Sequence, residues 1–161
     1  MPAPAFITEL RTKVGHDLLW LSGATAVVLD SSGRVLLGQR SDNHQWSLIS
    51  GILDPGEQPD HGVAREVLEE TGVTVMVEAL AAVRVTDPMT YPNGDQAQFL
   101  DLIFLCRPHA GTAWVADDES VAVGWFSLDA LPHPLLAHVR PTLENVLNYR
   151  ADPAAGVRWQ R

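Results

Sequence analysis

The sequence predicts an α+β fold, an α/β/α sandwich in which a mixed central sheet lies between helices. An amphipathic helix over residues 59–71 has strand-like apolar segments both before and after it. A short turn near residue 32 joins two of these segments, so the sheet should be mixed rather than purely parallel. A second helix close to the C-terminus supplies a layer for the other face of the sheet.

The N-terminal third is expected to form a helix, a hairpin and a short strand. Apolar residues at helical spacing predict a helix over 5–14, inside an N-terminal extension (1–20) that covers the core or exchanges with a partner subunit. Residues 24–30 and 34–39 are typical of strands, and the Ser-Ser-Gly turn between them predicts that they pair. A short strand over 46–49 then leads to Gly51.

The part after the central helix is expected to alternate strands with loops and to end in a helix. Proline can open that last helix at Pro141, because its missing N–H has no helical partner there. The Ala/Pro/Gly-rich tail, 151–161, is predicted to be loosely held. The other expected elements are one long or two short strands over 73–85, a loop over 86–96, a strand over 97–107, an irregular acidic stretch over 114–120 and a strand over 121–128.

Length and composition limit the class of protein. A chain of 161 residues fits a single domain, here 1–161. The net charge of −9 and the absence of a basic patch argue against a binder of duplex nucleic acid. No apolar run approaches the ~20 residues that span a bilayer, and the N-terminus lacks a secretory pattern. The single cysteine, Cys106, excludes an internal disulfide, so we expect a cytoplasmic protein without membrane contact.

Three carboxylates on the central helix are poorly placed for stability. Glu66, Glu69 and Glu70 stand at i, i+3 and i+4 and share one face. They also lie in the last turns, where the helix dipole favours cations. Arg65 can pair with Glu69 and reach back to Glu57, but one arginine does not neutralise four glutamates. Either the cluster is a solvated acidic face or it holds a hard cation, which takes oxygen ligands.

The complete pattern around these residues favours the second interpretation. Gly51 is followed after five residues by Glu57, and after seven more by the run Arg65-Glu66-Val67-Leu68-Glu69-Glu70-Thr71-Gly72-Val73. This pattern resembles the Nudix box at every specified position, so the chain is identified as a member of the Nudix hydrolase family, similar to MutT-like and ADP-ribose pyrophosphatase-like bacterial members. The resemblance covers roughly residues 23–150. The chain departs from the family in two places: Ile49-Ser50 stand where the family usually has Pro-Gly, and Ala122 stands where relatives often have Glu.

The resemblance implies a metal site and a set of roles. Mg²⁺ or Mn²⁺ would be bound by the three box carboxylates, the Gly51 carbonyl and waters. Arg65 belongs to the same catalytic group, and its pair with Glu57 would fix the loop against the helix. The general base is either Glu66 or an acid of a later loop, for which Glu119 is a candidate beside Asp117 and Asp118; a solvated acidic loop is the alternative reading of these acids.

The implied reaction is hydrolysis of the pyrophosphate linkage in a nucleoside diphosphate derivative. ADP-ribose or a nucleotide sugar, a nucleoside triphosphate and a dinucleoside polyphosphate all stay open, because Pro88 and Tyr91 match the marks of different branches. Arg40 and Arg84 are candidate phosphate ligands or surface ion-pair partners, and Tyr91 could stack on a base. The alternative function is a non-catalytic nucleotide-binding sensor, which the two departures motivate. Relatives commonly form homodimers.

Overall fold

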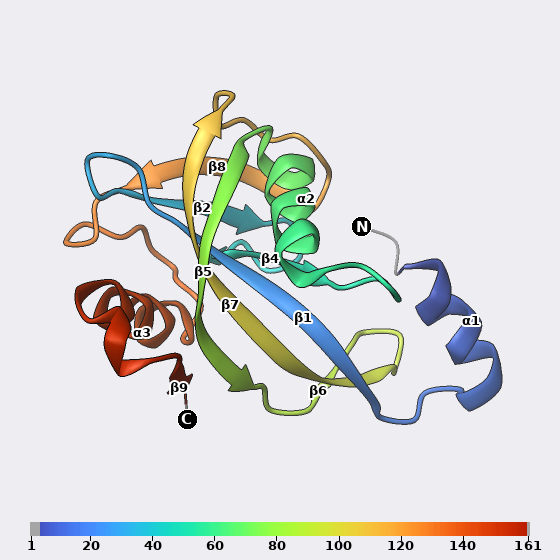
Figure 1. Cartoon of the computed structure of the whole chain (residues 1–161). Helices are drawn as coiled ribbons and strands as arrows, with labels where there is room; N and C mark the ends of the chain where they lie inside the picture. Colours follow the sequence, from blue (N-terminus) through green and yellow to red (C-terminus); the bar gives the residue numbers. More distant parts are fainter. Residues whose placement is uncertain (1–3, 161) are drawn as a thin grey trace.

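A computed structural model describes residues 4–160, and it places helices on both sides of a six-stranded sheet, with a separate three-stranded sheet beside it (Figure 1). Helix α2 packs on β1, β4 and β5, whereas α3 packs on β5, β7 and β9. The elements are α1 (Ala5–Val14), β1 (Leu19–Val28), β2 (Val35–Arg40), β3 (Trp46–Ser47), β4 (Ile49–Ile52), α2 (Pro59–Thr71), β5 (Thr74–Val85), β6 (Met89–Thr90), β7 (Gln96–Ala110), β8 (Ser120–Phe126), α3 (Val139–Ala151), a 3₁₀ turn (Pro153–Ala155) and β9 (Arg158–Gln160).

The larger sheet is mixed, as predicted. Its strands lie in the order β4-β1-β7-β5-β9, with β6 paired to the end of β7. Strand β1 runs parallel to β7 and antiparallel to β4, and β5 runs antiparallel to β7 and parallel to β9. The two longest strands, β5 and β7, are therefore in the interior of the sheet, where both of their faces can be covered.

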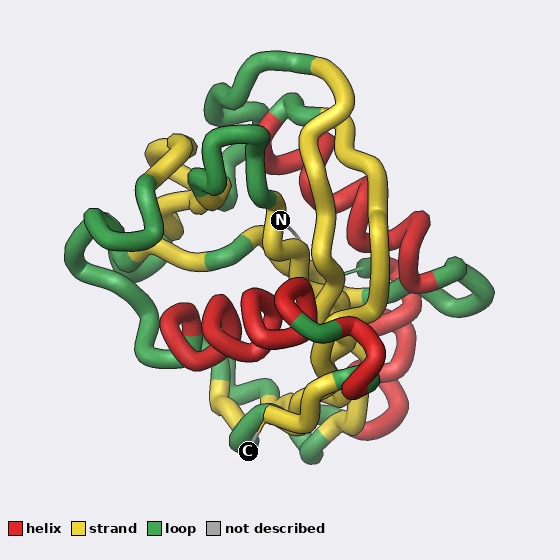
Figure 2. Tube along the Cα trace, turned by 60° about the vertical axis from the view of Figure 1, so that its left-hand side comes forward, coloured by secondary structure: helices red, strands yellow, loops and turns green. Residues whose placement is uncertain are grey.

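Alternate residues of β1 enter the two halves of the core. Val27 belongs to the cluster that contains Val139, Leu143 and Val146 of α3. Its neighbours along the strand, including Val28, belong to the cluster that contains the α2 residues Val63 and Val67. Since successive side chains of a strand point to opposite faces, α2 and α3 cover opposite faces of this sheet (Figures 1 and 2).

The predicted hairpin between residues 24–30 and 34–39 is wrong. The turn forms as expected, with the Asp30 carboxylate accepting the backbone N–H groups of Ser32 and Arg34. Beyond it, only an isolated bridge joins Leu29 to Val35. Strand β2 instead pairs with β3 and β8 in the smaller sheet. Local sequence cannot distinguish these outcomes, because both segments are apolar enough to be buried on both faces.

The strand predicted over residues 46–49 is divided between the two sheets. Trp46 and Ser47 pair with β2, and after the buried Leu48 the chain crosses to β1, which β4 borders as an edge strand. The crossing places Gly51 directly opposite Ala24. Ile49 stands where a proline was expected, and it has the N–H that a proline lacks; the departure is therefore compatible with a regular strand before Gly51.

The N-terminal helix covers the protein's own core. Ile7 packs with Leu21 and Ala97, and the Arg11 guanidinium donates to the backbone carbonyl of Gln96 at 2.6 Å. The helix therefore has the predicted bounds, and of its two predicted roles it has that of covering the core. Among residues 4–160, no helix has the length and apolar character required to cross a membrane.

The tail beyond residue 151 differs from the loose segment that the sequence predicted. Its last described residues form β9, which extends the large sheet beside Ala82 and Arg84 of β5. Side chains also tie the tail to α3: Thr142 donates to Gln160 at 3.1 Å and Arg158 donates to the Asn148 carbonyl at 3.2 Å. Sheet pairing orders a tail whose composition alone suggests a linker.

Candidate active site

Helix α2 has the bounds and caps that the sequence predicted. Pro59 occupies its first turn, and Gly72 ends it in the left-handed conformation (φ 68°) with its N–H on the Leu68 carbonyl. Val63 and Val67 are fully buried against the sheet. Glu66 and Glu70 are buried on the same side of the helix as these valines, whereas Glu69 remains exposed.

Arg65 braces the loop before α2 against the helix. Its Nε and Nη2 donate to the two carboxylate oxygens of Glu57 at 2.8 and 2.9 Å. Its Nη1 donates to Glu66 at 2.8 Å and to Glu69 at 3.1 Å. The hydrogen bond from Arg65 holds the pKa of Glu57 below its ordinary value, although burial opposes the shift. The predicted contact between Glu57 and Arg65 is thus present, and the same guanidinium reaches two box glutamates.

Glu66 lies against the backbone of Gly51. The Glu66 carboxylate is almost inaccessible, and a Cβ placed on Gly51 would collide with it. Only glycine allows strand β4 and this carboxylate to approach so closely. The glycine of the motif is therefore required by contact with Glu66, the first glutamate on the helix, although the two residues are fifteen positions apart in the sequence.

Glu70 is a buried acid among other acids. Its exposed fraction is 6%, and burial, followed by the nearby negative charges of Glu119, Glu66 and Asp117, raises its pKa to about 9, with only Arg40 opposing them. Burial also raises the pKa of Glu66, although Arg65 opposes the shift. Extra positive charge at this place would stabilise both carboxylates in their ionised forms.

The predicted trio does not converge on one point. The Glu69 side chain is 44% exposed and turned to Arg65. Within residues 4–160, no group of three or more His, Cys, Asp or Glu side chains is arranged to hold a metal ion. Glu66 lies against the backbone of Gly51, and its carboxylate is near enough to Glu70 to affect the Glu70 pKa. This all-oxygen set suits Mg²⁺ or Mn²⁺, which commonly use one or two protein carboxylates and complete their shell with water and substrate phosphates.

Two other predicted site residues, Arg40 and Glu119, affect the Glu70 pKa. Arg40 donates to both oxygens of Asp42, at 2.9 and 2.6 Å; this contact, with smaller contributions from Glu119 and Tyr91, raises the Arg40 pKa. Glu119 follows the loop that binds the end of α2, and its backbone carbonyl accepts the Ser41 N–H at 2.7 Å. Tyr91 is half-buried, and burial raises its pKa while Arg40 lowers it. Arg40 and Glu119 therefore act electrostatically on Glu70, and Tyr91 is linked to Arg40.

Sequence reasoning missed Thr25 and Asp101, which form a second polar group on the large sheet with Arg84. The Thr25 hydroxyl donates to Asp101 at 2.9 Å, and Arg84 also contacts this carboxylate. Burial, then the neighbouring Arg84, lowers the pKa of His138 to about 4. The available signal was Asp101 itself, a charge in the otherwise apolar run Phe99 to Cys106.

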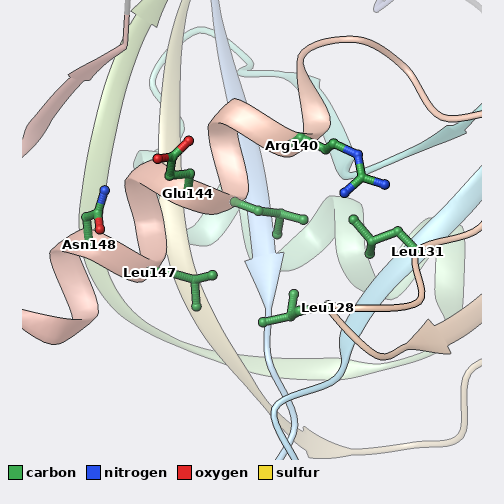
Figure 3. A pocket seen from close by; sticks show the side chains of 7 residues that line it. Leu128, Leu131, Arg140, Glu144, Leu147 and Asn148 are labelled. Carbon is green, nitrogen blue, oxygen red and sulfur yellow. The ribbon is translucent and has the colours of Figure 1, made fainter.

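A hollow beside α3 is separate from these residues. It has a volume of about 280 Å³, at or below the ~300–1,000 Å³ typical of small-molecule pockets. Figure 3 shows its lining, in which leucines of α3 and of the segment after β8 meet a polar rim. No residue of the acidic helix contributes to it. Its lining residues are Leu128, Leu131, Arg140, Leu143, Glu144, Leu147 and Asn148.

Comparison with known proteins agrees with the fold and the motif. The family model described as the NUDIX domain matches residues 20–146. A "MutT-like protein" of Streptomyces ambofaciens is 40% identical over 103 residues, which are 64% of this chain and 61% of that protein. The human "8-oxo-dGDP phosphatase NUDT18" is 34% identical over 143 residues, 85% of this chain and 39% of that protein. The chain thus spans less than two thirds of the length of these relatives.

A solved structure gives the same result in three dimensions. The crystal structure of an ADP-ribose pyrophosphatase from Streptococcus suis superposes with a TM-score of 0.68 and 26% identity, covering 87% of this chain and 98% of that one. Taken together, the mixed sheet between two helical layers and the complete box on α2 define a Nudix fold. The chain belongs to the Nudix hydrolase family.

Proposed function

We propose that this chain is a hydrolase, dependent on Mg²⁺ or Mn²⁺, that cleaves the pyrophosphate linkage of a nucleoside diphosphate derivative. The observation that carries the proposal is the pair Glu66 and Glu70. Both are buried, Glu66 lies against Gly51, and their negative charge exceeds the positive charge near them. Buried like charges destabilise a protein unless something compensates them. A divalent ion with bound phosphate completes such a site.

The roles of the chain's residues follow from their positions. Glu66, Glu70 and the Gly51 carbonyl would hold the cation, and Arg65 keeps Glu66 in place while it braces the loop through Glu57. When bound, the cation neutralises phosphate charge and makes water a better nucleophile. Arg40 lies where a phosphate of the substrate can accept its remaining donors, and Tyr91 flanks the same region. Glu69, exposed and paired to Arg65, contributes to the charge of the site from its margin.

Two residues are candidates for the general base. Glu66 is next to the proposed cation, and Glu119 is close enough to raise the pKa of both Glu66 and Glu70. We expect the variant that removes the base to lose the limb of the pH–rate profile that reports its ionisation. Comparison of Glu66→Gln with Glu119→Gln therefore assigns the role.

The substrate class follows from the relatives' activities and is tested by a screen. Relatives are named for 8-oxo-dGDP and ADP-ribose, and both compounds contain a pyrophosphate joined to a nucleoside. We expect activity on at least one compound among oxidised and normal nucleoside di- and triphosphates, ADP-ribose, nucleotide sugars and dinucleoside polyphosphates. The test is phosphate or nucleotide release with Mg²⁺ and its loss with EDTA. Binding without turnover across the screen would instead support the nucleotide sensor.

The remaining properties are proposed from charge and composition. A net charge of −9 disfavours contact with duplex nucleic acid, and we expect a cytoplasmic enzyme that acts on small nucleotides. Homodimer formation is a further proposal, and light scattering on the purified chain tests it.

A further inference from the structure

The loop between β7 and β8 lies against the end of helix α2 (Figure 1). The Trp114 N–H donates to the Thr71 carbonyl at 3.0 Å. The Ala116 N–H donates to the Glu70 carbonyl at 3.2 Å. The last carbonyls of an α-helix have no partner within the helix, and the last turn of α2 contains no basic side chain that could reach them. The loop therefore supplies hydrogen bonds to the end of this helix.

The indole ring of Trp114 lies over Gly72, the residue that ends the helix. A Cβ on Gly72 would collide with this ring, and a Cβ on Gly111 would collide with the Gly72 carbonyl. Both glycines have positive φ, which a larger residue adopts only with strain. Trp114 is 60% exposed, so the ring adds less to the core than a buried tryptophan does. Its close contact is with the helix end, which fixes where the loop begins.

The residues that follow this contact are acids. Asp117 comes directly after Ala116, and its carboxylate accepts the Glu119 N–H at 3.0 Å. The Glu119 carbonyl accepts the Ser41 N–H at 2.7 Å, which attaches the far end of the loop to the segment after β2. Both acids oppose the ionisation of Glu70. Because like charges repel, the loop stays close to Glu70 only if it is held at both ends.

We propose that Trp114 is a positioning residue: its contact with Gly72 fixes the acidic loop beside Glu70, and the loop thereby strengthens the binding of a divalent cation. The inference rests on the proposed function for the cation. Negative charge close to a bound cation attracts it, and the attraction is larger near a buried group than in water. Without the ring, only the two backbone hydrogen bonds would hold the start of the loop against the repulsion between its acids and Glu70.

The first test measures the loop in the metal-free chain. Amide hydrogen exchange, followed by NMR, compares Trp114→Ala with the unmodified chain. The amides of Ala116 and Ser41 should exchange at least about 10-fold faster in the variant, because the loop opens locally. The amide of Val67, buried within α2, should change by less than about threefold. Unchanged rates in the loop, or equal acceleration at all three amides, would overturn the inference.

The second test asks whether the position of the loop affects the cation. Calorimetric titration with Mn²⁺ compares Trp114→Ala, Glu119→Gln and the double variant. Glu119→Gln should weaken Mn²⁺ binding by about 10-fold when Trp114 is present, as residues outside the direct ligands commonly do. It should weaken binding by less than about twofold when position 114 is already alanine, since residues that act together are non-additive. Additive losses would mean that the ring only stabilises the fold, and the inference would fail alone.

The matched control is Trp159→Ala, which removes a tryptophan that is 73% exposed on β9, at the opposite edge of the large sheet from β4. It should change neither measurement. Trp114→Phe keeps an aromatic ring over Gly72 and should retain most of the Mn²⁺ affinity; a loss as large as that of Trp114→Ala would count against the packing argument. If melting curves show that Trp114→Ala does not fold, Trp114→Leu takes its place in both tests.

The two tests separate this inference from the proposed function. If the unmodified chain binds no Mn²⁺, the proposed function fails together with the effect on the cation. Faster exchange in the loop of Trp114→Ala would still support the positioning role of Trp114.

Discussion

Four glutamates of the same motif have two opposite environments. Glu57 and Glu69 both accept hydrogen bonds from Arg65, and this one guanidinium supplies their counter-charge. Glu66 and Glu70 point inward, where burial raises the pKa of each. The motif therefore has two parts with separate functions. One part is a structural brace that is complete within the chain, and the other is an acidic pair that needs positive charge from outside it.

The largest expected effect is on activity when the inward pair is broken. Glu70→Gln should lower kcat/KM by more than about 100-fold, because even groups outside the metal's direct ligands commonly contribute 10–100-fold. The same change should raise Tm in EDTA at pH 8, since it removes a buried carboxylate crowded by Glu66, Glu119 and Asp117. Glu69→Gln should have the smaller kinetic effect. Equal activity losses in the two variants would contradict the division into brace and acidic pair.

A second test perturbs the inward pair from the backbone side. In Gly51→Ala the new methyl group collides with the Glu66 carboxylate and must displace it. We expect Mn²⁺ affinity, measured by calorimetry with bound nucleotide, to fall by about 10–100-fold. Ser50→Ala, at an exposed neighbouring position of β4, is the control and should bind Mn²⁺ normally. Full affinity in Gly51→Ala would mean that Glu66 does not hold the ion.

The brace should matter more for stability than for metal binding. Arg65→Met removes hydrogen bonds to Glu57, Glu66 and Glu69 and leaves a partly buried carboxylate unpaired. The expected loss is about 2 kcal/mol of unfolding free energy, between the values for exposed and buried pairs. Denaturant titration at pH 7 measures it. Arg65→Lys should recover part of this loss, because it keeps the positive charge but not the bidentate contact with Glu57. If Arg65→Lys recovers none of the loss, the charge of Arg65 does not stabilise the fold without its bidentate hydrogen bonds.

The last test concerns His138, a base rather than an acid whose pKa is shifted by burial. Its pKa is lowered to about 4 in the folded chain, first by burial and then by Arg84. As pH falls below ~6.5 the unfolded chain gains a proton there that the folded chain does not. Folding stability should therefore be lost between about pH 6.5 and 4, by on the order of 3 kcal/mol. His138→Asn should flatten this part of the stability profile, and parallel profiles for the two proteins would refute the assignment.

Helix α2 is the part of the fold that local sequence patterns predicted best. Its bounds, its two caps and the brace from Arg65 to Glu57 were all predictable, because each depends on residues close in sequence or on a motif of fixed spacing. The strand partners were not. The segments that became β1 and β2 look like a hairpin locally, yet each is apolar on both faces and found partners in a different sheet. The tail was misjudged for a related reason, since β9 is ordered by pairing with β5 rather than by its own composition.

The candidate site also has features that the sequence predicted and features that only the tertiary structure revealed. Sequence spacing identified Glu66, Glu69 and Glu70 as one helical face, and by itself it established the Nudix motif. Only the tertiary structure decided that Glu66 and Glu70 are buried, that Glu69 turns to Arg65, and that Arg84 meets Asp101 across two strands. Burial and cross-strand contact depend on which distant segments pack together. A helix face and its caps depend on neighbours within a few residues, so local sequence is enough to predict them.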